Sequence, residues 1–408
     1  MHYGLLGRKL GHSYSPQIHR YLGNYEYKLY EQEPENIGVF LKTTSFLGLN
    51  VTMPYKKDVI AYCSELSNEA RKLGAVNTIV RQTDGSLIGH NTDYFGFLST
   101  VQKTGLSVCD KKALVLGSGG ASVTAVAVLK ELGASVVCIS RSGENSYNNL
   151  DLHSDAALIV NATPVGMYPD TNVSPISLDL FQNLEGVIDL IYNPARTALL
   201  QQAEKRGIIA ENGLWMLVAQ AKESSEWFTG RKLDDAVISE IYNKLSQQMQ
   251  NIVLIGMPGS GKSTVGKLLA QLANKEFVDA DAYLEQTADM SIPDIFTKYG
   301  EEYFRELETQ VLSQLGKRSG LIIATGGGCV TRKDNYPLLH QNGVLVWLRR
   351  DIGSLPTDGR PLSQTGKLTE MYNLRKPLYT AFCDIAIDNN SDPMITAKNI
   401  LLDLQREI

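Results

Sequence analysis

Cysteine is scarce in this chain and follows no recognisable pattern. Five of the 408 residues are cysteine, and no two of them form a Cys-x-x-Cys pair. An odd, scattered set gives no sign of a disulfide framework and is typical of reduced thiols in a cytosolic protein. The five are Cys63, Cys109, Cys138, Cys329 and Cys383.

The sequence also lacks a large excess of one charge and any long apolar run. Its formal net charge is −5 and its isoelectric point is near 5.8, which argues against a broad surface for nucleic acid or membrane. No apolar run approaches the roughly 20 residues needed to cross a bilayer, and the first residues lack the layout of a signal peptide. We therefore expect a soluble, cytoplasmic protein without a nucleic-acid or membrane partner. Its oligomeric state is not predicted.

Two glycine-rich turns organise a chain that is long enough for two or three domains. One turn spans residues 117–122 and the other spans residues 256–263, and each lies between a short apolar run and a helix-like stretch. Strand, glycine turn and helix begin a βαβ unit. The sequence therefore predicts an α/β protein with parallel sheets in both parts and a domain joint at 245–250.

The second turn matches a complete phosphate-binding signature. Residues 256–263 read Gly-Met-Pro-Gly-Ser-Gly-Lys-Ser and fit G-x-x-x-x-G-K-[ST]. Backbone N–H groups of such a loop surround phosphate oxygens, and the following helix N-terminus adds positive potential. The lysine reaches the outer phosphates and the last hydroxyl can bind Mg²⁺. A merely flexible turn is the less favoured interpretation. The predicted ATP-binding residues here are Gly256, Gly259, Ser260, Gly261, Lys262, Ser263 and Thr264.

Two acids follow the next predicted strand. Asp279 and Asp281 occupy alternate positions at the end of residues 277–281, so in a strand both would point the same way. The carboxyl end of a strand is where open α/β sheets bind ligands. One acid can serve Mg²⁺ and the other a substrate hydroxyl, or the pair can be a simple acidic turn.

A predicted helix then carries a carboxylate in its apolar stripe. Glu308 falls on the face that Phe304 shares with residues 307, 311, 312 and 315. Arg305, three residues away, is its natural partner. The pair is either a structural ion pair or a means of aiming Arg305 at an anionic substrate. Next, a buried strand at 321–325 runs into Gly326–Gly328, which indicates close approach of a ligand to the backbone.

Together these features closely resemble shikimate kinase over nearly all of residues 250–408. Two further stretches share the resemblance, Arg360-Pro-Leu and Arg375-Lys-Pro-Leu-Tyr. The resemblance implies a P-loop α/β domain of the NMP-kinase type that uses ATP and Mg²⁺ to phosphorylate shikimate. The segment between Leu348 and Arg360 is shorter than in many family members, which abbreviates the lid. The implied roles are carboxylate binding by Arg305 and Arg375, hydroxyl binding and proton acceptance by Asp281, catalysis by Lys262, substrate contact at Gly327 and Gly328, metal binding by Ser263 and Asp279, and phosphate contact from a lid by Arg360.

The first glycine turn is a weaker nucleotide signal. It fits G-x-G-x-x-G/A except that Ser122 takes the third position. The next strand is predicted to end near Ser140 and Arg141, where NAD-binding folds usually carry an acid for the ribose. An arginine there suits a 2′-phosphate and hence NADP, although a solvated surface arginine is the alternative.

Polar residues before this turn suggest a substrate site. Ser13 and Ser15 are close enough to bind one carboxylate, and the alternation of residues 49–54 places Asn50 and Thr52 on one strand face. Lys56 follows a proline, and we predict that it lies in the first turn of a helix, although most lysines are surface residues. Asp93 is predicted in a turn, where an acid is often only a cap.

These segments together resemble shikimate dehydrogenase over about residues 1–246. The shared stretches include His-Ser-x-Ser-Pro at 12–16, Asn-Val-Thr-x-Pro-x-Lys at 50–56, Asn-Thr-Asp at 91–93 and Asn-Ala-Thr-Pro-Val-Gly-Met at 161–167. The resemblance implies a substrate lobe (1–98 and 213–246) and a Rossmann-like NADP lobe (99–212). The span from Arg141 to Val160 is shorter than is usual in the family. The implied site residues are Lys56 and Asp93 as the acid–base pair, Ser13, Ser15, Thr52, Asn77, Asp93, Tyr192 and Gln220 for substrate, and Gly117, Gly119, Gly120, Ala121, Ser140, Arg141, Asn161 and Gly213 for NADP(H).

The two resemblances lead to one function. The chain is predicted to be a bifunctional enzyme of chorismate biosynthesis that reduces 3-dehydroshikimate with NADPH and then phosphorylates shikimate with ATP and Mg²⁺. Two alternatives stay open. The first half can be a substrate-binding or regulatory module without turnover, or it can be a quinate dehydrogenase that uses NAD.

Overall fold

The computed structural model describes residues 2–11, 13–355 and 367–406. The chain divides into two compact units. The first contains residues up to Met167 together with Val173–Tyr192 and Leu199–Lys244, and the second contains Tyr168–Asn172, Asn193–Ala198 and the chain from Leu245 onward. The limits 1–246 and 250–408 stay a prediction for the domains as functional parts.

The first sheet of unit 1 is mixed, with strand order β2-β1-β3-β5-β6-β4. Strand β1 pairs in parallel with β2 and β3, whereas β3–β5 and β5–β6 are antiparallel. The reversal between β5 and β6 is a tight turn with Gly85 at φ +87°, a conformation that favours glycine. The expected parallel pairing therefore holds here only in part. The strands are β1 (Tyr3–Gly7), β2 (Tyr27–Glu31), β3 (Gly48–Val51), β4 (Glu65–Leu66), β5 (Thr78–Arg81) and β6 (Leu87–His90).

The two faces of this sheet differ in polarity. Leu49, Val51 and Ile79 enter an apolar core with α2 (Ile37–Thr43). The alternate residues Asn50 and Thr78 face α7 (Leu214–Thr229) and hydrogen-bond to it, as the two-residue period of a strand requires. Other helices of this region are α1 (Ser15–Leu22), α3 (Asn68–Leu73), α4 (Asp93–Thr104) and α8 (Ala236–Met249).

The second sheet of unit 1 is parallel, with order β11-β10-β9-β7-β8. Leu114 and Leu116 enter one core, and Ala113 and Val115 enter another on the opposite face. Strand β8 ends the sheet, because the chain after it forms a 3₁₀ helix at Tyr147–His153. The short span from Arg141 to Val160 thus adds no strand to the edge of the sheet next to β8. The elements are β7 (Lys112–Leu116), α5 (Gly120–Glu131), β8 (Ser135–Ile139), β9 (Leu158–Asn161), β10 (Gly186–Asp189), α6 (Ala198–Lys205) and β11 (Ile209–Glu211).

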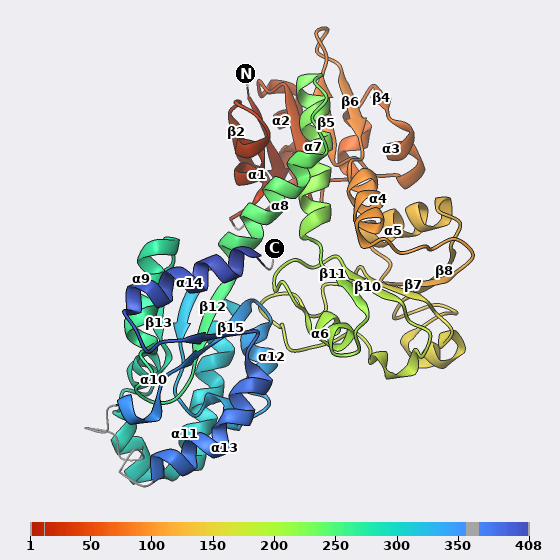
Figure 1. Cartoon of the computed structure of the whole chain (residues 1–408). Helices are drawn as coiled ribbons and strands as arrows, with labels where there is room; N and C mark the ends of the chain where they lie inside the picture. The colour runs from red at the N-terminus through yellow and green to blue at the C-terminus, as the bar shows by residue number, and fades with distance from the viewer. Residues whose placement is uncertain (1, 12, 356–366, 407–408) are drawn as a thin grey trace. The chain divides into compact units, whose positions relative to one another are not determined.

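Unit 2 is built on a five-stranded parallel sheet with order β13-β14-β12-β15-β16. Val253 and Ile255 of the central strand point into one core, and Ile252 and Leu254 point into the other. Figure 1 shows these strands between their helices. The strands are β12 (Asn251–Ile255), β13 (Glu276–Asp279), β14 (Leu321–Ala324), β15 (Gly343–Arg349) and β16 (Ile385–Asp388); the helices are α9 (Lys262–Ala273), α10 (Ala280–Ala288), α11 (Ile292–Lys317), α12 (Asn335–His340), α13 (Lys367–Phe382) and α14 (Pro393–Arg406).

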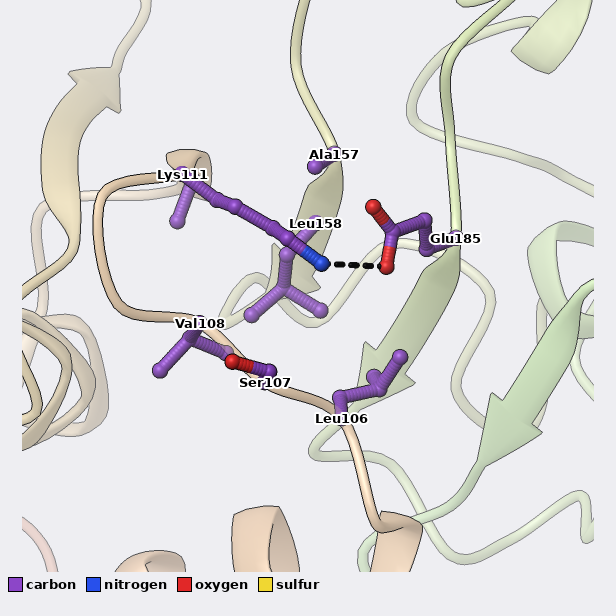
Figure 2. A pocket seen from close by; sticks show the side chains of 8 residues that line it. Leu106, Ser107, Val108, Lys111, Ala157, Leu158 and Glu185 are labelled. Atoms are coloured by element: carbon purple, nitrogen blue, oxygen red, sulfur yellow. Dashed lines mark hydrogen bonds and ion pairs between the residues drawn. The ribbon is translucent and has the colours of Figure 1, made fainter.

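A shallow pocket lies where strands of the second sheet begin. Leu106, Val108 and Leu158 line it. Figure 2 shows the side chains of Lys111 and Glu185 pointing toward each other, and Lys111 Nζ lies 2.6 Å from Glu185 Oε2. The glycine turn after β7 lies at the opposite, carboxyl edge of the same sheet. This pocket is therefore not the predicted nucleotide site.

None of the described helices is long and apolar enough to span a bilayer. All five cysteines are free, as the sequence predicted. The cytoplasmic location stays a prediction.

Close packing between α11 and α12 yields a stability prediction. A Cβ added at Gly316 would clash with the backbone carbonyl of Leu338, whereas one added at Gly353 would meet no atom within 4 Å. We expect Gly316→Ala to destabilise unit 2 by about 1–3 kcal/mol, because a backbone atom cannot yield as a side chain can. Urea denaturation followed by Trp347 fluorescence and circular dichroism measures the effect. Gly353→Ala is the matched control, and equal midpoints for the two variants would contradict the packing argument.

Candidate functional sites

Lys56 and Asp93 form the centre of the site in unit 1. Lys56 Nζ lies 2.6 Å from Asp93 Oδ2, and the two side chains are 28% and 18% exposed. Asp93 is the first residue of α4, where a carboxylate meets the positive end of the helix dipole. The predicted helical position of Lys56 is wrong, because the residue lies in a turn and the 3₁₀ helix after it begins only at Asp58. The pair is nevertheless formed, and it is accessible to a ligand.

Asn77 holds the second carboxylate oxygen of this pair. Its Nδ2 donates to Asp93 Oδ1 at 2.9 Å, and its Oδ1 accepts the backbone N–H of Thr92 at 2.7 Å. A backbone N–H can only donate, so the orientation of the amide is fixed. The orientation of Asp93 toward Lys56 is therefore set by Asn77 as well as by the helix.

The other predicted substrate residues are arranged around this network. Gln220 lies on α7 with its Oε1 3.4 Å from Thr92 Oγ1. Ser15 begins α1, and its backbone N–H donates to Ser13 Oγ at 3.2 Å. Thr52 follows β3 directly. Tyr192 follows β10 and packs edge-on against Tyr14 with 6.1 Å between ring centroids. Within the described residues, hydrogen bonds join Gln220 to the Asn77–Asp93 group through Thr92, whereas the Thr52 and Tyr192 side chains stand outside that network.

The glycine turn of unit 1 has the geometry of a nucleotide loop. Gly117 has φ +110° and Gly119 is the N-cap of α5. A Cβ added at Gly119 or Gly120 would meet no atom within 4 Å, so the backbone is open to a ligand beside the helix N-terminus. Ser122 donates from Oγ to the Gly117 carbonyl at 2.7 Å. The unusual third residue thus closes the turn, while Ala121 stays exposed beside it.

The remaining cofactor residues fall into two groups. Ser140 and Arg141 follow β8, and Arg141 is exposed, as binding of a 2′-phosphate would require. Asn161, by contrast, is fully buried, donates to Asp189 Oδ1 at 3.0 Å and accepts from the Thr163 backbone at 3.1 Å. Gly213 packs against the Leu190 carbonyl too closely for a side chain. Asn161 and Gly213 therefore shape the loops around them. Direct contact of either residue with the cofactor stays a prediction.

The phosphate loop of unit 2 has the form that its sequence predicts. Gly256, Gly259 and Gly261 have φ of +145°, +81° and +94°, which few side chains tolerate. The Lys262 ammonium donates to the carbonyls of residues 256 and 257 at 2.9 and 3.0 Å. The buried hydroxyl of Ser260 has no hydrogen-bond partner among the described residues, so the loop offers an unpaired donor of the kind that a phosphate oxygen satisfies. Thr264, in the first turn of α9, is exposed.

The two acids after β13 differ in role. Strand β13 ends at Asp279, which caps α10 by accepting the N–H groups of residues 281 and 282. The predicted strand alternation is therefore wrong, since Asp281 lies in the first turn of that helix. Ser263 donates to Asp279 Oδ2 at 2.6 Å, which places two oxygen ligands of the type Mg²⁺ prefers side by side. Burial, reinforced by the charges of Glu308 and Asp279, raises the pKa of Asp281 to about 6.

Arg305 forms ion pairs with two carboxylates, and its guanidinium packs closely against a glycine. Arg305 Nη1 lies 2.8 Å from Glu308, with side chains only 9% and 4% exposed, and Nη2 lies 3.1 Å from the exposed Glu301. A Cβ at Gly328 would collide with the Arg305 guanidinium, and one at Gly326 would lie 2.6 Å from Glu308 and 2.8 Å from Asp281. The glycine triplet therefore lets these charged groups approach the backbone.

A second arginine meets the same triplet. Arg375 on α13 donates from Nη1 to the Gly327 carbonyl at 3.2 Å, and the buried Tyr379 hydroxyl donates to the same oxygen at 2.5 Å. A Cβ at Gly327 would also meet the ring of Pro258 in the phosphate loop. The structure thus brings Arg305, Arg375 and the triplet together next to the phosphate loop. Arg360 and the lid that it was predicted to occupy lie outside the described residues.

Sequence reasoning missed the residues that support these side chains. Thr92, Tyr27 and Ser224 hydrogen-bond around Asn77 and Asn50, and Tyr379 fixes the Gly327 carbonyl. Ser224 had a readable signal, because it lies four residues after Gln220 and hence on the same face of the helix.

Two family models match separate parts of the chain. Residues 5–79 match the shikimate dehydrogenase substrate binding domain, and residues 258–405 match shikimate kinase. The second match includes the phosphate loop from Pro258 on, the acids after β13, both arginines and the glycine triplet.

Individual relatives match about three fifths of the chain. A shikimate dehydrogenase (NADP(+)) from Clostridium beijerinckii is 35% identical over 261 residues, which is 59% of this chain and 96% of the relative. The solved chorismate mutase/shikimate 5-dehydrogenase fusion protein from Clostridium acetobutylicum is 37% identical with a TM-score of 0.57, covering 60% of this chain and 96% of its own. The Thermus thermophilus shikimate 5-dehydrogenase in complex with NADP(H) and shikimate is 31% identical with a TM-score of 0.55, covering 60% and 99%.

These matches fall in the same order as the two sites. The match to the dehydrogenase substrate binding domain lies at residues 5–79, and the kinase match begins within the phosphate loop at residue 258. One chain thus combines an oxidoreductase with a phosphotransferase. The chain belongs to the shikimate dehydrogenase family and carries a shikimate kinase domain in its second part.

Proposed function

We propose that this chain makes shikimate by NADPH-dependent reduction of 3-dehydroshikimate and then phosphorylates it to shikimate 3-phosphate with ATP. One observation supports the proposal: the chain covers nearly the full length of shikimate dehydrogenases, and a shikimate kinase match at residues 258–405 lies after the dehydrogenase match at residues 5–79. The product hydroxyl created by the first reaction is the group that the second reaction phosphorylates.

In the first reaction, the chain binds the substrate and supplies a proton. Ser13 and Ser15 bind the carboxylate, while Thr52, Asn77, Tyr192 and Gln220 position the ring oxygens. The glycine turn and Arg141 would hold NADPH, which would supply the hydride that the carbonyl carbon gains. Lys56 and Asp93, 2.6 Å apart, deliver the proton that the carbonyl oxygen gains. The intact pair argues against a module without turnover.

In the second reaction, the chain orients shikimate against the phosphate loop. Arg305 and Arg375 bind the carboxylate, and Gly327 and Gly328 leave room for the ring. Asp281 accepts the proton of the attacking hydroxyl, for which its raised pKa near 6 is suited. Lys262 offsets charge on the transferred phosphoryl group, and Ser263 and Asp279 hold the Mg²⁺ that accompanies ATP. Arg360 contacts the phosphates of ATP.

A single incubation tests the whole proposal. The full chain is mixed with 3-dehydroshikimate, NADPH, ATP and Mg²⁺, and products are followed by mass spectrometry. We expect shikimate to appear first and shikimate 3-phosphate to follow, with one NADPH oxidised per shikimate formed. Omitting ATP should stop the sequence at shikimate. Failure to oxidise NADPH, with shikimate still phosphorylated when it is supplied, would reduce the first half to a binding module; faster turnover with quinate and NAD would identify a quinate dehydrogenase instead.

The Lys56–Asp93 contact predicts a selective loss. Lys56→Ala removes the proton donor, and we expect reduction of 3-dehydroshikimate to fall by at least about 100-fold, the range typical of general acid catalysis. Kinase turnover on added shikimate should stay within about twofold, which makes it an internal control for the amount of active chain. Normal reduction by this variant would exclude Lys56 from the mechanism.

The two partners of Arg305 predict unequal effects in the kinase domain. Glu308→Gln takes the charge from a buried pair, so we expect a loss of about 3 kcal/mol in unfolding free energy and a higher KM for shikimate. Glu301→Gln removes an exposed partner and should change stability by less than about 0.5 kcal/mol. Chemical denaturation and shikimate-dependent ADP release measure both effects. Equal behaviour of the two variants would mean that Glu308 does not hold Arg305 in place.

A further inference from the structure

A buried polar network lies between the first sheet and α7, beneath the residues proposed to bind substrate. Its centre is Ser224, whose side chain is fully buried. Ser224 Oγ lies 2.8 Å from Asn50 Nδ2, 2.9 Å from Thr78 Oγ1 and 3.0 Å from Thr92 Oγ1. It also lies 2.9 Å from the carbonyl of Gln220, one turn earlier on the helix. One hydroxyl therefore joins β3, β5, the turn before α4 and α7.

One bond of this network has a fixed direction, because the Ser224 hydroxyl must donate to the Gln220 carbonyl. The Tyr27 hydroxyl donates to Asn50 Oδ1 at 2.7 Å, and Asn50 Nδ2 donates to the hydroxyls of Thr78 and Ser224. The Thr78 hydroxyl in turn donates to Asn77 Oδ1 at 3.1 Å. Asn77 Nδ2 then faces Asp93, which contacts Lys56. The Ser224 proton is used on the Gln220 carbonyl and the Thr78 proton on Asn77, so Ser224 accepts from Thr92, which in turn accepts from Asn77 Nδ2 at 3.1 Å. Ser224 thus lies three hydrogen bonds away from the Asp93 carboxylate through Thr92 and Asn77.

Replacement of Ser224 by alanine would remove a hydroxyl that four polar groups surround. A hydroxyl offers one donor and two acceptor sites, and here four groups surround it. The methyl group of alanine can satisfy none of them, and no water can replace the oxygen without room in a closely packed interior. The amide of Asn50 and the hydroxyls of Thr78 and Thr92 would then reorient to find other partners. Asn77 and Gln220 would lose their fixed positions as a result.

We propose that Ser224 is a positioning residue for the reduction of 3-dehydroshikimate, acting through Thr92 on Asn77 and through α7 on Gln220. This inference rests on the proposed function. Ser224 does not touch the reacting atoms. It holds the helix that carries Gln220 against the strands that carry Asn77, so that both amides face one ligand.

The test is Ser224→Ala in the full chain, with Ser225→Ala as the matched control. Ser225 is the next residue of α7 and is equally buried, but its hydroxyl accepts from Tyr25 instead of joining the network. We expect Ser224→Ala to lower kcat/KM for 3-dehydroshikimate about tenfold, the effect of unsatisfied buried donors. KM should rise by at least about threefold, because Asn77 and Gln220 contact the bound substrate. Ser225→Ala should stay within about twofold of the unaltered chain.

KM and kinase activity separate a positioning effect from a loss of folded protein. Unfolding of part of the sample lowers apparent kcat without changing KM. Phosphorylation of shikimate by the same samples measures the amount of active chain. In an Asn77→Ala background, Ser224→Ala should cause a clearly smaller further loss, because both changes act through one residue. An unchanged KM in Ser224→Ala, an equal loss in Ser225→Ala, or full additivity with Asn77→Ala would each overturn the proposal. Absence of reduction by the unaltered chain would instead overturn the proposed function.

Discussion

Both sites depend on a carboxylate whose orientation is fixed by its hydrogen-bonding partners, Asp93 in unit 1 and Glu308 in unit 2. A carboxylate that leaves water needs a charged or hydrogen-bonding partner, and the partners fix its direction. In unit 1, Asn77 and Lys56 each take one oxygen of Asp93. In unit 2, Arg305 takes one oxygen of Glu308, while the other oxygen is buried without a partner among the described residues. The first arrangement is complete before substrate arrives, and the second leaves a buried acceptor beside the proposed shikimate site.

Glycine makes the second arrangement sterically possible. Gly326 lies against Glu308 and Asp281, and Gly328 lies against Arg305, so a side chain at either position would displace these charged groups. The phosphate loop uses glycine differently, because three of its residues need positive φ values. The same residue type thus serves close approach in one loop and backbone conformation in the other. Both loops follow neighbouring parallel strands, β14 and β12, and therefore end at the same edge of the sheet.

The sequence predicted what depends on local pattern and missed what depends on distant packing. The phosphate loop and the Arg305–Glu308 pair were readable because their residues lie within a few positions of one another. The helical position of Lys56 was wrong, because a proline permits a turn and a 3₁₀ helix as readily as the start of an α-helix. Asp281 was placed in a strand because the alternation did not reveal that Asp279 caps a helix. The bond from Asn50 to Ser224 spans 174 positions of the chain, and no spacing rule reaches that far.

Under the proposed function, the two sites recognise the same carboxylic acid by different chemistry. The dehydrogenase site offers neutral hydroxyls at Ser13 and Ser15, whereas the kinase site offers the guanidinium groups of Arg305 and Arg375. Hydrogen bonds from charged donors are stronger than those from neutral ones, and their strength depends more on salt. In the kinase the substrate lies beside a triphosphate, whose negative charge repels the substrate carboxylate, so the arginines must offset that repulsion. In the dehydrogenase the reacting carbonyl is neutral, and a network of neutral groups around Ser224 and Asn77 is sufficient to hold the ring while one proton moves.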